Sequence, residues 1–200
     1  DLPSLLKQFG LVGEDFEFKE LPAFDDCNLL VSTQGQRYVL KAHNALLTAG
    51  SRQRLEAQDR VIQRLHDRGL PVPTVVRCTS GESMVALEPH APGGPIPYAR
   101  LLTYLDGDIV PNEIPKDAAF LQAVGELVGR VAVALAGFED PGAHWTWDWD
   151  MKRVPEVVRQ KLSFIADEER RRLASRLADE YEAALGAGSL RFLIPFFMQT

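Results

Sequence analysis

The chain has 200 residues and a mass of 22.3 kDa, and its 28 acidic and 22 basic side chains give a formal charge of −6. Its 46% hydrophobic and 25% charged residues are typical of a globular protein and exclude a disordered or collagen-like polymer. The acidic balance argues against a nucleic-acid partner. No apolar run approaches the roughly 20 residues of a membrane span, so we expect no membrane partner. The two cysteines exclude a disulfide framework and favour a cytoplasmic location.

The first half of the chain alternates between short β-rich runs and helices. Period-two alternation, punctuated by Gly and Pro, predicts an antiparallel meander, and a helix with an apolar stripe follows it. In chain order, the predicted elements are a helix over 4–9, strands over 16–21, 27–33 and 36–42, a helix over 50–68, a hairpin of 72–78 and 83–88, and a strand over 100–105.

The second half is predicted to be helical. Apolar residues recur at helical spacing over 116–136, and two further helices are predicted over 151–165 and 166–185. Gly125 and Gly129 on the first of these helices predict close packing of a neighbour.

One lysine and one glutamate stand out from this pattern. Lys41 closes the apolar run Tyr38-Val39-Leu40, and the helix that follows carries Glu56. In two-lobed phosphotransferases a strand lysine holds nucleotide phosphates, and a helix glutamate pairs with that lysine.

Longer words make the resemblance specific. The sequence resembles the aminoglycoside phosphotransferase superfamily, and within it hydroxylysine kinases, through motifs that occur in family order over roughly residues 15 to 160. They are Leu21-Pro22-Ala23-Phe24-Asp25-Asp26-Cys27-Asn28, Tyr38-Val39-Leu40-Lys41, Glu56-Ala57-Gln58, Arg100-Leu101-Leu102-Thr103-Tyr104-Leu105-Asp106-Gly107 and Trp149-Asp150-Met151-Lys152-Arg153-Val154-Pro155.

The resemblance implies a protein-kinase-like two-lobed α+β fold and a role for each matching residue. Lys41 would hold the phosphates of GTP or ATP, and Glu56 would orient Lys41. The phosphate loop would contain Asp25, Asp26 and Asn28. The hinge that reads the base would be formed by Leu102, Thr103, Tyr104 and Leu105. The implied reaction is transfer of the γ-phosphate, with Mg²⁺, to the hydroxyl of a small amine, with 5-hydroxy-L-lysine as the best guess.

The resemblance fails at the catalytic loop. The family continues with His-x-Asp-x-x-x-x-Asn and a metal-binding Asp, but none of the four histidines, His43, His66, His90 and His144, begins a His-x-Asp. We therefore name no catalytic residue and no metal ligand, and we expect this chain alone to be inactive. Residues 192–200 are apolar where the loop would stand, and we interpret them as an aberrant tail from splicing or gene annotation.

We therefore predict a nucleotide-binding lobe over 1–105, built on a five-stranded antiparallel sheet, and a partial helical lobe over 106–200. Asp148, Trp149 and Asp150 are weak candidates for the acceptor site, since a cationic substrate favours carboxylates and aromatic faces. Two alternatives stay open: a kinase for an aminoglycoside, choline or homoserine, and a non-catalytic nucleotide-binding fragment. The oligomeric state is undecided.

Overall fold

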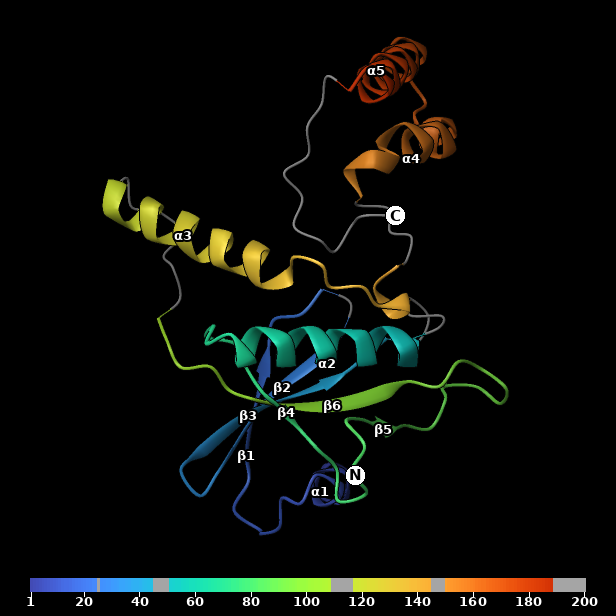
Figure 1. Cartoon of the computed structure of the whole chain (residues 1–200). Coiled ribbons are helices and arrows are strands. Elements are labelled where there is room, and N and C mark those ends of the chain that lie inside the picture. The colour runs from blue at the N-terminus through green and yellow to red at the C-terminus, as the bar shows by residue number, and fades with distance from the viewer. Residues whose placement is uncertain (25, 45–50, 109–116, 145–149, 189–200) are drawn as a thin grey trace. The chain divides into compact units, whose positions relative to one another are not determined.

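A computed structural model describes residues 1–24, 26–44, 51–108, 117–144 and 150–188 (Figure 1). The chain divides into two compact units, Asp1–Ala143 and His144–Thr200. The predicted lobe boundary near residue 105 stays a prediction.

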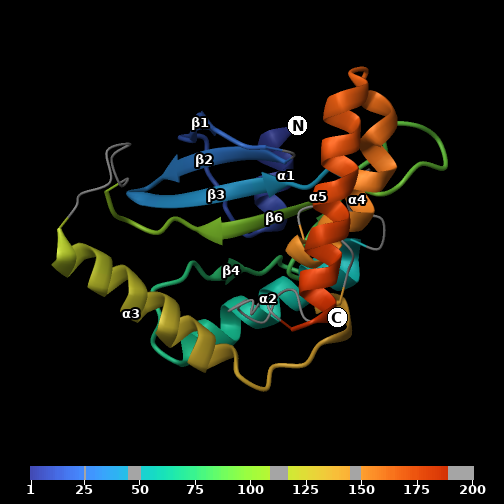
Figure 2. The same ribbon diagram turned by 90° about the horizontal axis from the view of Figure 1, so that it is seen from above.

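A six-stranded antiparallel sheet organises the described part of the first unit. Its strands are β1 (Glu17–Leu21), β2 (Cys27–Thr33), β3 (Gln36–Ala42), β4 (Val75–Val76), β5 (Val85–Ala86) and β6 (Tyr98–Thr103). The strand order is β1-β2-β3-β6-β4, with β5 also paired to β6 (Figure 2). The α+β fold is as predicted, although the sheet has six strands and not five.

The predicted strand segments already number six, and both arms of the predicted hairpin join the sheet through β6. β4 pairs with Leu101 and Leu102, and β5 pairs with Tyr98 and Ala99. The prediction that 72–78 and 83–88 pair as strands with each other was wrong. Pro73 has no N–H to donate to a strand ladder, and within this arm only Val75 and Val76 become strand.

The turn between β2 and β3 was predicted correctly. Gln34 and Gly35 both have positive φ, 49° and 75°. Two such residues in succession are typical of the tight hairpin turn whose twist matches that of the strands. The turn therefore fixes the register in which Asn28 lies opposite Lys41.

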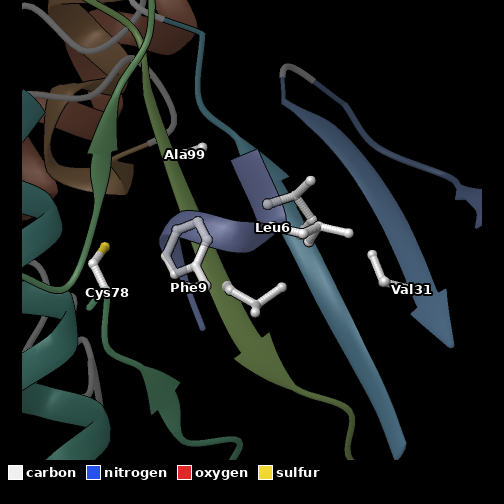
Figure 3. Close-up of a cluster of buried hydrophobic side chains, with 7 residues drawn as sticks. Leu6, Phe9, Val31, Cys78 and Ala99 are labelled. Carbon is white, nitrogen blue, oxygen red and sulfur yellow. The ribbon is translucent and has the colours of Figure 1, made fainter. Parts of the chain in front are cut away.

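One face of the sheet packs against α1 (Leu2–Gln8), whose first turn is capped by the Asp1 carboxylate. Leu6 of this helix is fully buried against the sheet, and Phe9 just after it is 3% exposed (Figure 3). Both residues belong to a buried hydrophobic core cluster. Its members are Leu6, Phe9, Val31, Leu40, Cys78, Ala99 and Leu101. Burial in this core raises the pKa of the Cys78 thiol.

The opposite face of the sheet is covered by α2 (Ser51–Asp67) (Figure 1). The apolar stripe predicted for this helix comprises Leu55, Val61, Ile62 and Leu65; all are buried except Ile62, which is partly exposed. Arg60 and Arg64 of α2 hold the following segment, and Arg60 donates to the Asp140 carboxylate. Arg64 donates to the carbonyls of Ala134 and Ala136, at 2.8 and 2.7 Å, at the end of α3 (Ala118–Leu135).

The helix α3 is apolar but largely exposed in the described structure. Its exposed large side chains include Leu121, Val124, Leu127, Val128 and Val133. With 18 residues and a mean hydropathy of 1.5, α3 is long and apolar enough to cross a bilayer. Core helices of water-soluble proteins meet the same criteria, so this helix alone is weak evidence for a membrane-spanning segment. The premise that no apolar run approaches the length of a span was therefore wrong for Ala118–Leu135, while the expected absence of a membrane partner stays a prediction.

The second unit contains a helical hairpin. The chain passes through 3-10 turns at Met151–Arg153 and Leu162–Phe164, which flank α4 (Val154–Lys161), and continues into α5 (Glu168–Gly186). The single helix predicted over 151–165 is thus divided into three pieces. Arg159 of α4 pairs with Asp179 and Glu182 of α5.

The glycines allow a direct test of packing in the first unit. Gly142 lies so close to α2 that an added Cβ would be 2.3 Å from the Gln53 carbonyl oxygen and 2.9 Å from the Ala57 Cβ. We expect Gly142→Ala to lower the free energy of unfolding by about 1–3 kcal/mol, measured by urea denaturation, because the backbone of α2 must move.

Gly125→Ala is the matched control. An added Cβ at Gly125 or Gly129 meets no described atom within 4 Å, so the predicted close neighbour is not found there. We expect Gly125→Ala to raise stability by roughly 0.5–1 kcal/mol, because alanine is the better helix former. Equal effects of the two substitutions would contradict the packing of the Gly142 turn on α2.

Candidate active site

Lys41 lies on β3 in a polar row that crosses three strands. It is opposite Asn28 of β2 on one side and opposite Arg100 of β6 on the other. Directly opposed residues of an antiparallel pair point to the same face. All three side chains therefore lie on the face that α2 covers.

The Lys41 ammonium group is held by one side chain of the β1–β2 connection and one side chain of β2. Its Nζ donates to Asn28 Oδ1 at 2.8 Å and lies 3.7 Å from Asp26 Oδ2. The lysine side chain keeps 24% of its surface exposed. An ammonium group has three donors, so these contacts orient Lys41 while leaving it a donor for a further ligand.

The structure thus brings together three of the predicted site residues, Lys41, Asp26 and Asn28. Asp26 belongs to the connection, but Asn28 lies inside β2 and faces Lys41 across the ladder. Asp25 is outside the described residues. The connection also borders an open hollow lined by Glu20, Leu21, Pro22, Ala23, Asp26, Cys27 and Asn28.

Lys41 and Glu56 do not form the predicted ion pair among the residues that the structure describes. Glu56 accepts a hydrogen bond from Arg52, one helical turn earlier, at 2.8 Å, and Arg52 also pairs with Glu82. Glu56 lines a hollow together with Thr74 and Val75 beside β4. Because β6 separates β4 from β3, this side of α2 is not the side nearest Lys41.

The predicted hinge is the end of β6 and the residues after it. Two of its backbone donors are already occupied: the Thr103 N–H donates to the Thr74 carbonyl, and the Tyr104 N–H donates to the Arg37 carbonyl, both at 2.9 Å. The Thr103 hydroxyl also accepts from the Thr74 N–H at 2.8 Å. Leu105 follows the strand, with its side chain 52% exposed.

Arg37 of β3 fixes this hinge from the side. Its guanidinium group lies 4.5 Å from the centre of the Tyr104 ring and pairs with Asp106. Cation–π stacking and an ion pair at one side chain hold the chain as it leaves β6.

The sequence analysis missed a buried polar network next to Lys41. Arg100 is 2% exposed and His43 is 6% exposed. The Arg100 Nε donates to His43 Nε2 at 3.0 Å, and His43 Nδ1 lies 2.9 Å from Asp26 Oδ2. The signal was present in the sequence, because an arginine beside the apolar Leu101-Leu102 needs a partner once it is buried.

Arg100 is anchored on α2 by its remaining donors. They reach Asp59 Oδ1 at 2.7 Å, Gln58 Oε1 at 2.8 Å and the Leu55 carbonyl at 3.3 Å. Burial, together with the charge of Arg100, lowers the pKa of His43 to about 4, although Asp26 acts in the opposite direction. The imidazole is therefore neutral at pH 7.

The weak acceptor-site candidates gain little from the structure. Trp149 and Asp148 lie outside the described residues. Asp150 is 9% exposed, and its carboxylate accepts from the Lys152 N–H at 2.9 Å, which caps the turn before α4. No group of three or more potential metal ligands gathers in the part of the chain that the structure describes.

Known proteins resemble this chain in sequence and in fold. A hydroxylysine kinase from Danio rerio is 25% identical over 170 residues, which are 82% of this chain and 47% of that protein. The chain thus spans about half the length of this curated relative.

Among solved structures, the amicoumacin kinase hAmiN has a TM-score of 0.65 at 18% identity, over 88% of this chain and 49% of that one. A microcompartment-associated aminopropanol kinase has a TM-score of 0.57 at 17% identity, over 76% of this chain and 45% of that one. These two likenesses support the kinase-like fold. Residues 17–193 match the phosphotransferase enzyme family, and the chain belongs to that family.

Proposed function

We propose that this chain forms the nucleotide-binding part of a small-molecule kinase, which transfers the γ-phosphate of ATP or GTP to a hydroxyl group. The observation that carries the proposal is the position of Lys41. Its ammonium group is oriented by Asn28 of β2 and by Asp26 of the β1–β2 connection, and Lys41 lies on the strand next to the hinge strand. A lysine placed in this way between a loop and a hinge suits binding of nucleotide phosphates.

The hinge suits recognition of a base edge at one backbone donor. The N–H groups of Thr103 and Tyr104 already donate to carbonyls of the protein. We therefore assign the base contact to the N–H of Leu105. Either purine can accept such a hydrogen bond, so the choice between ATP and GTP depends on contacts beyond this one.

For the acceptor we propose 5-hydroxy-L-lysine. The support is the zebrafish relative, which matches over 82% of this chain. An aminoglycoside, choline or homoserine acceptor is the alternative within the same reaction class. We place the reaction in the cytoplasm, in keeping with the two free cysteines.

The chemical step needs groups that this sequence does not supply. Mg²⁺ would arrive with the nucleotide and neutralise phosphate charge, but the described residues contain no cluster of ligands to hold it. No His-x-Asp is present to accept the proton of the substrate hydroxyl. We therefore propose that these 200 residues bind nucleotide without turning it over.

A first test measures nucleotide binding by calorimetry, with Mg²⁺–ATP and Mg²⁺–GTP in separate titrations. Lys41→Ala should weaken binding on the order of 10- to 100-fold, because it removes a charged hydrogen bond to phosphate. Lys19→Ala, an exposed lysine of β1, is the matched control and should bind like the wild type. Equal affinities for all three proteins would overturn the assignment of Lys41.

A second test separates a backbone contact from a side-chain contact at the hinge. Leu105→Pro removes the N–H and should weaken nucleotide binding about tenfold, whereas Leu105→Ala keeps the N–H and should bind like the wild type. Urea denaturation of both variants checks that folding is retained. Tight binding by a folded Leu105→Pro protein would contradict the proposed base contact.

A third test concerns turnover. We expect the 200-residue chain to phosphorylate 5-hydroxy-L-lysine no faster than Lys41→Ala does, with either nucleotide, because loss of a catalytic unit costs on the order of 10⁴- to 10⁶-fold in rate. Product formation is followed by mass spectrometry. Turnover that depends on Lys41 would refute the proposed inactivity of this chain and leave its kinase assignment intact.

A further inference from the structure

We propose that His43 is a positioning residue, which links Arg100 on its α2 anchor to Asp26 and so holds the phosphate-side connection and Lys41 in their binding arrangement. This inference rests on the proposed nucleotide-binding function. It assigns to a buried histidine the coupling between helix and lysine that the pair of Lys41 and Glu56 was expected to provide.

The contacts of His43 leave one protonation state. Arginine nitrogens only donate, so the His43 Nε2 that faces Arg100 at 3.0 Å must accept. The carboxylate of Asp26 accepts, so the Nδ1 at 2.9 Å must carry the proton. The ring is therefore the neutral Nδ1–H tautomer. Both hydrogen bonds run in the same direction, because Arg100 donates to the ring and the ring donates to Asp26.

The two ends of this link are fixed to different elements. Arg100 is tied to α2 through Asp59, Gln58 and the Leu55 carbonyl. Asp26 lies before β2, and its carboxylate contacts Lys41. The same carboxylate also accepts a hydrogen bond from the Asn44 N–H at 3.3 Å. A shift of α2 is thus transmitted to the carboxylate beside Lys41 through one imidazole.

Protonation would break the link. An imidazolium carries a proton on Nε2, and that proton would face the Nε–H of Arg100, donor against donor and cation against cation. Arg100 and Lys41 disfavour the charged ring and Asp26 favours it, and with burial the balance lowers its pKa to about 4. The folded pKa lies below the unfolded value of 6.5, so the contribution of the neutral ring is complete above pH 6.5 and is lost as the pH falls towards 4.

Two substitutions cut the link at different ends. Gln at position 43 can place an acceptor near the Nε2 position, which keeps the Arg100 contact but removes the donor to Asp26. Asn at position 43 can place a donor near the Nδ1 position, which keeps the Asp26 contact and removes the acceptor for Arg100. We expect His43→Gln and His43→Asn each to weaken Mg²⁺–ATP or Mg²⁺–GTP binding about 3- to 10-fold at pH 7.5, since each removes one hydrogen bond of the link.

The pH profile separates positioning from packing. Because the ring of the folded protein titrates with a pKa of about 4, the ratio of the dissociation constants of His43→Gln and the wild type should keep that 3- to 10-fold value down to about pH 5 and fall towards one only as the pH passes below 4. The titration of the nucleotide phosphates cancels in this ratio. If both folded variants bind with the wild-type dissociation constant at every pH, His43 only packs, and the inference is overturned.

Ring ¹⁵N NMR tests the link without any nucleotide. We expect a neutral His43 ring protonated at Nδ1 at pH 7, and a ring free to change tautomer in Arg100→Lys. A ring protonated at Nε2 in the wild type would overturn the inference. If the wild type and Lys41→Ala bind neither nucleotide while the Nδ1–H ring is observed, the proposed function has failed, and the positioning role fails with it. If Lys41→Ala alone weakens binding, only the inference about His43 has failed.

Discussion

A guanidinium group buried under a helix constrains everything around it, because every donor that leaves water must find an acceptor in the protein. Arg100 meets this demand with one imidazole nitrogen, two side chains of α2 and one backbone carbonyl. Those acceptors come from α2 and from the residue that follows β3, so satisfying one side chain sets the position of the helix over the sheet. Leaving such a charge without its partners costs about 3–5 kcal/mol.

The order of elements could be predicted because it depends on local patterns. The bounds of β2 and β3 were predicted to the residue, since the pair Gln34-Gly35 forms a turn of two positive-φ residues between two short apolar runs. The last strand was placed two residues too late. Tyr98 and Ala99 pair with β5, Ala99 also pairs with Ala42 of β3, and the N–H of Tyr104 is taken by Arg37. Such pairings join residues far apart in sequence and leave no local signal.

The same distinction applies to the candidate site. Lys41 could be identified because a lysine that ends an apolar strand is a local feature. Its partners could not be identified with the same certainty, because an acid on the next helix and an acid before the previous strand are equally plausible from sequence. The rotation of α2 decides between them, and that rotation follows from the contacts of Arg100 with Gln58 and Asp59. The structure accordingly gives Lys41 the nearer carboxylate of Asp26 and gives Glu56 to Arg52.

The link from Asp59 through Arg100 and His43 to Asp26 also has an evolutionary consequence. Each member forms a hydrogen bond with the next one. A change at one position therefore leaves a buried donor or acceptor of its neighbour without a partner. Accepted substitutions at these four positions should therefore occur in sets, with the loss of the arginine accompanied by apolar residues at both 43 and 59. A lineage that keeps the histidine should keep an arginine or another donor on β6. We therefore expect these four positions to change together in aligned sequences of the family.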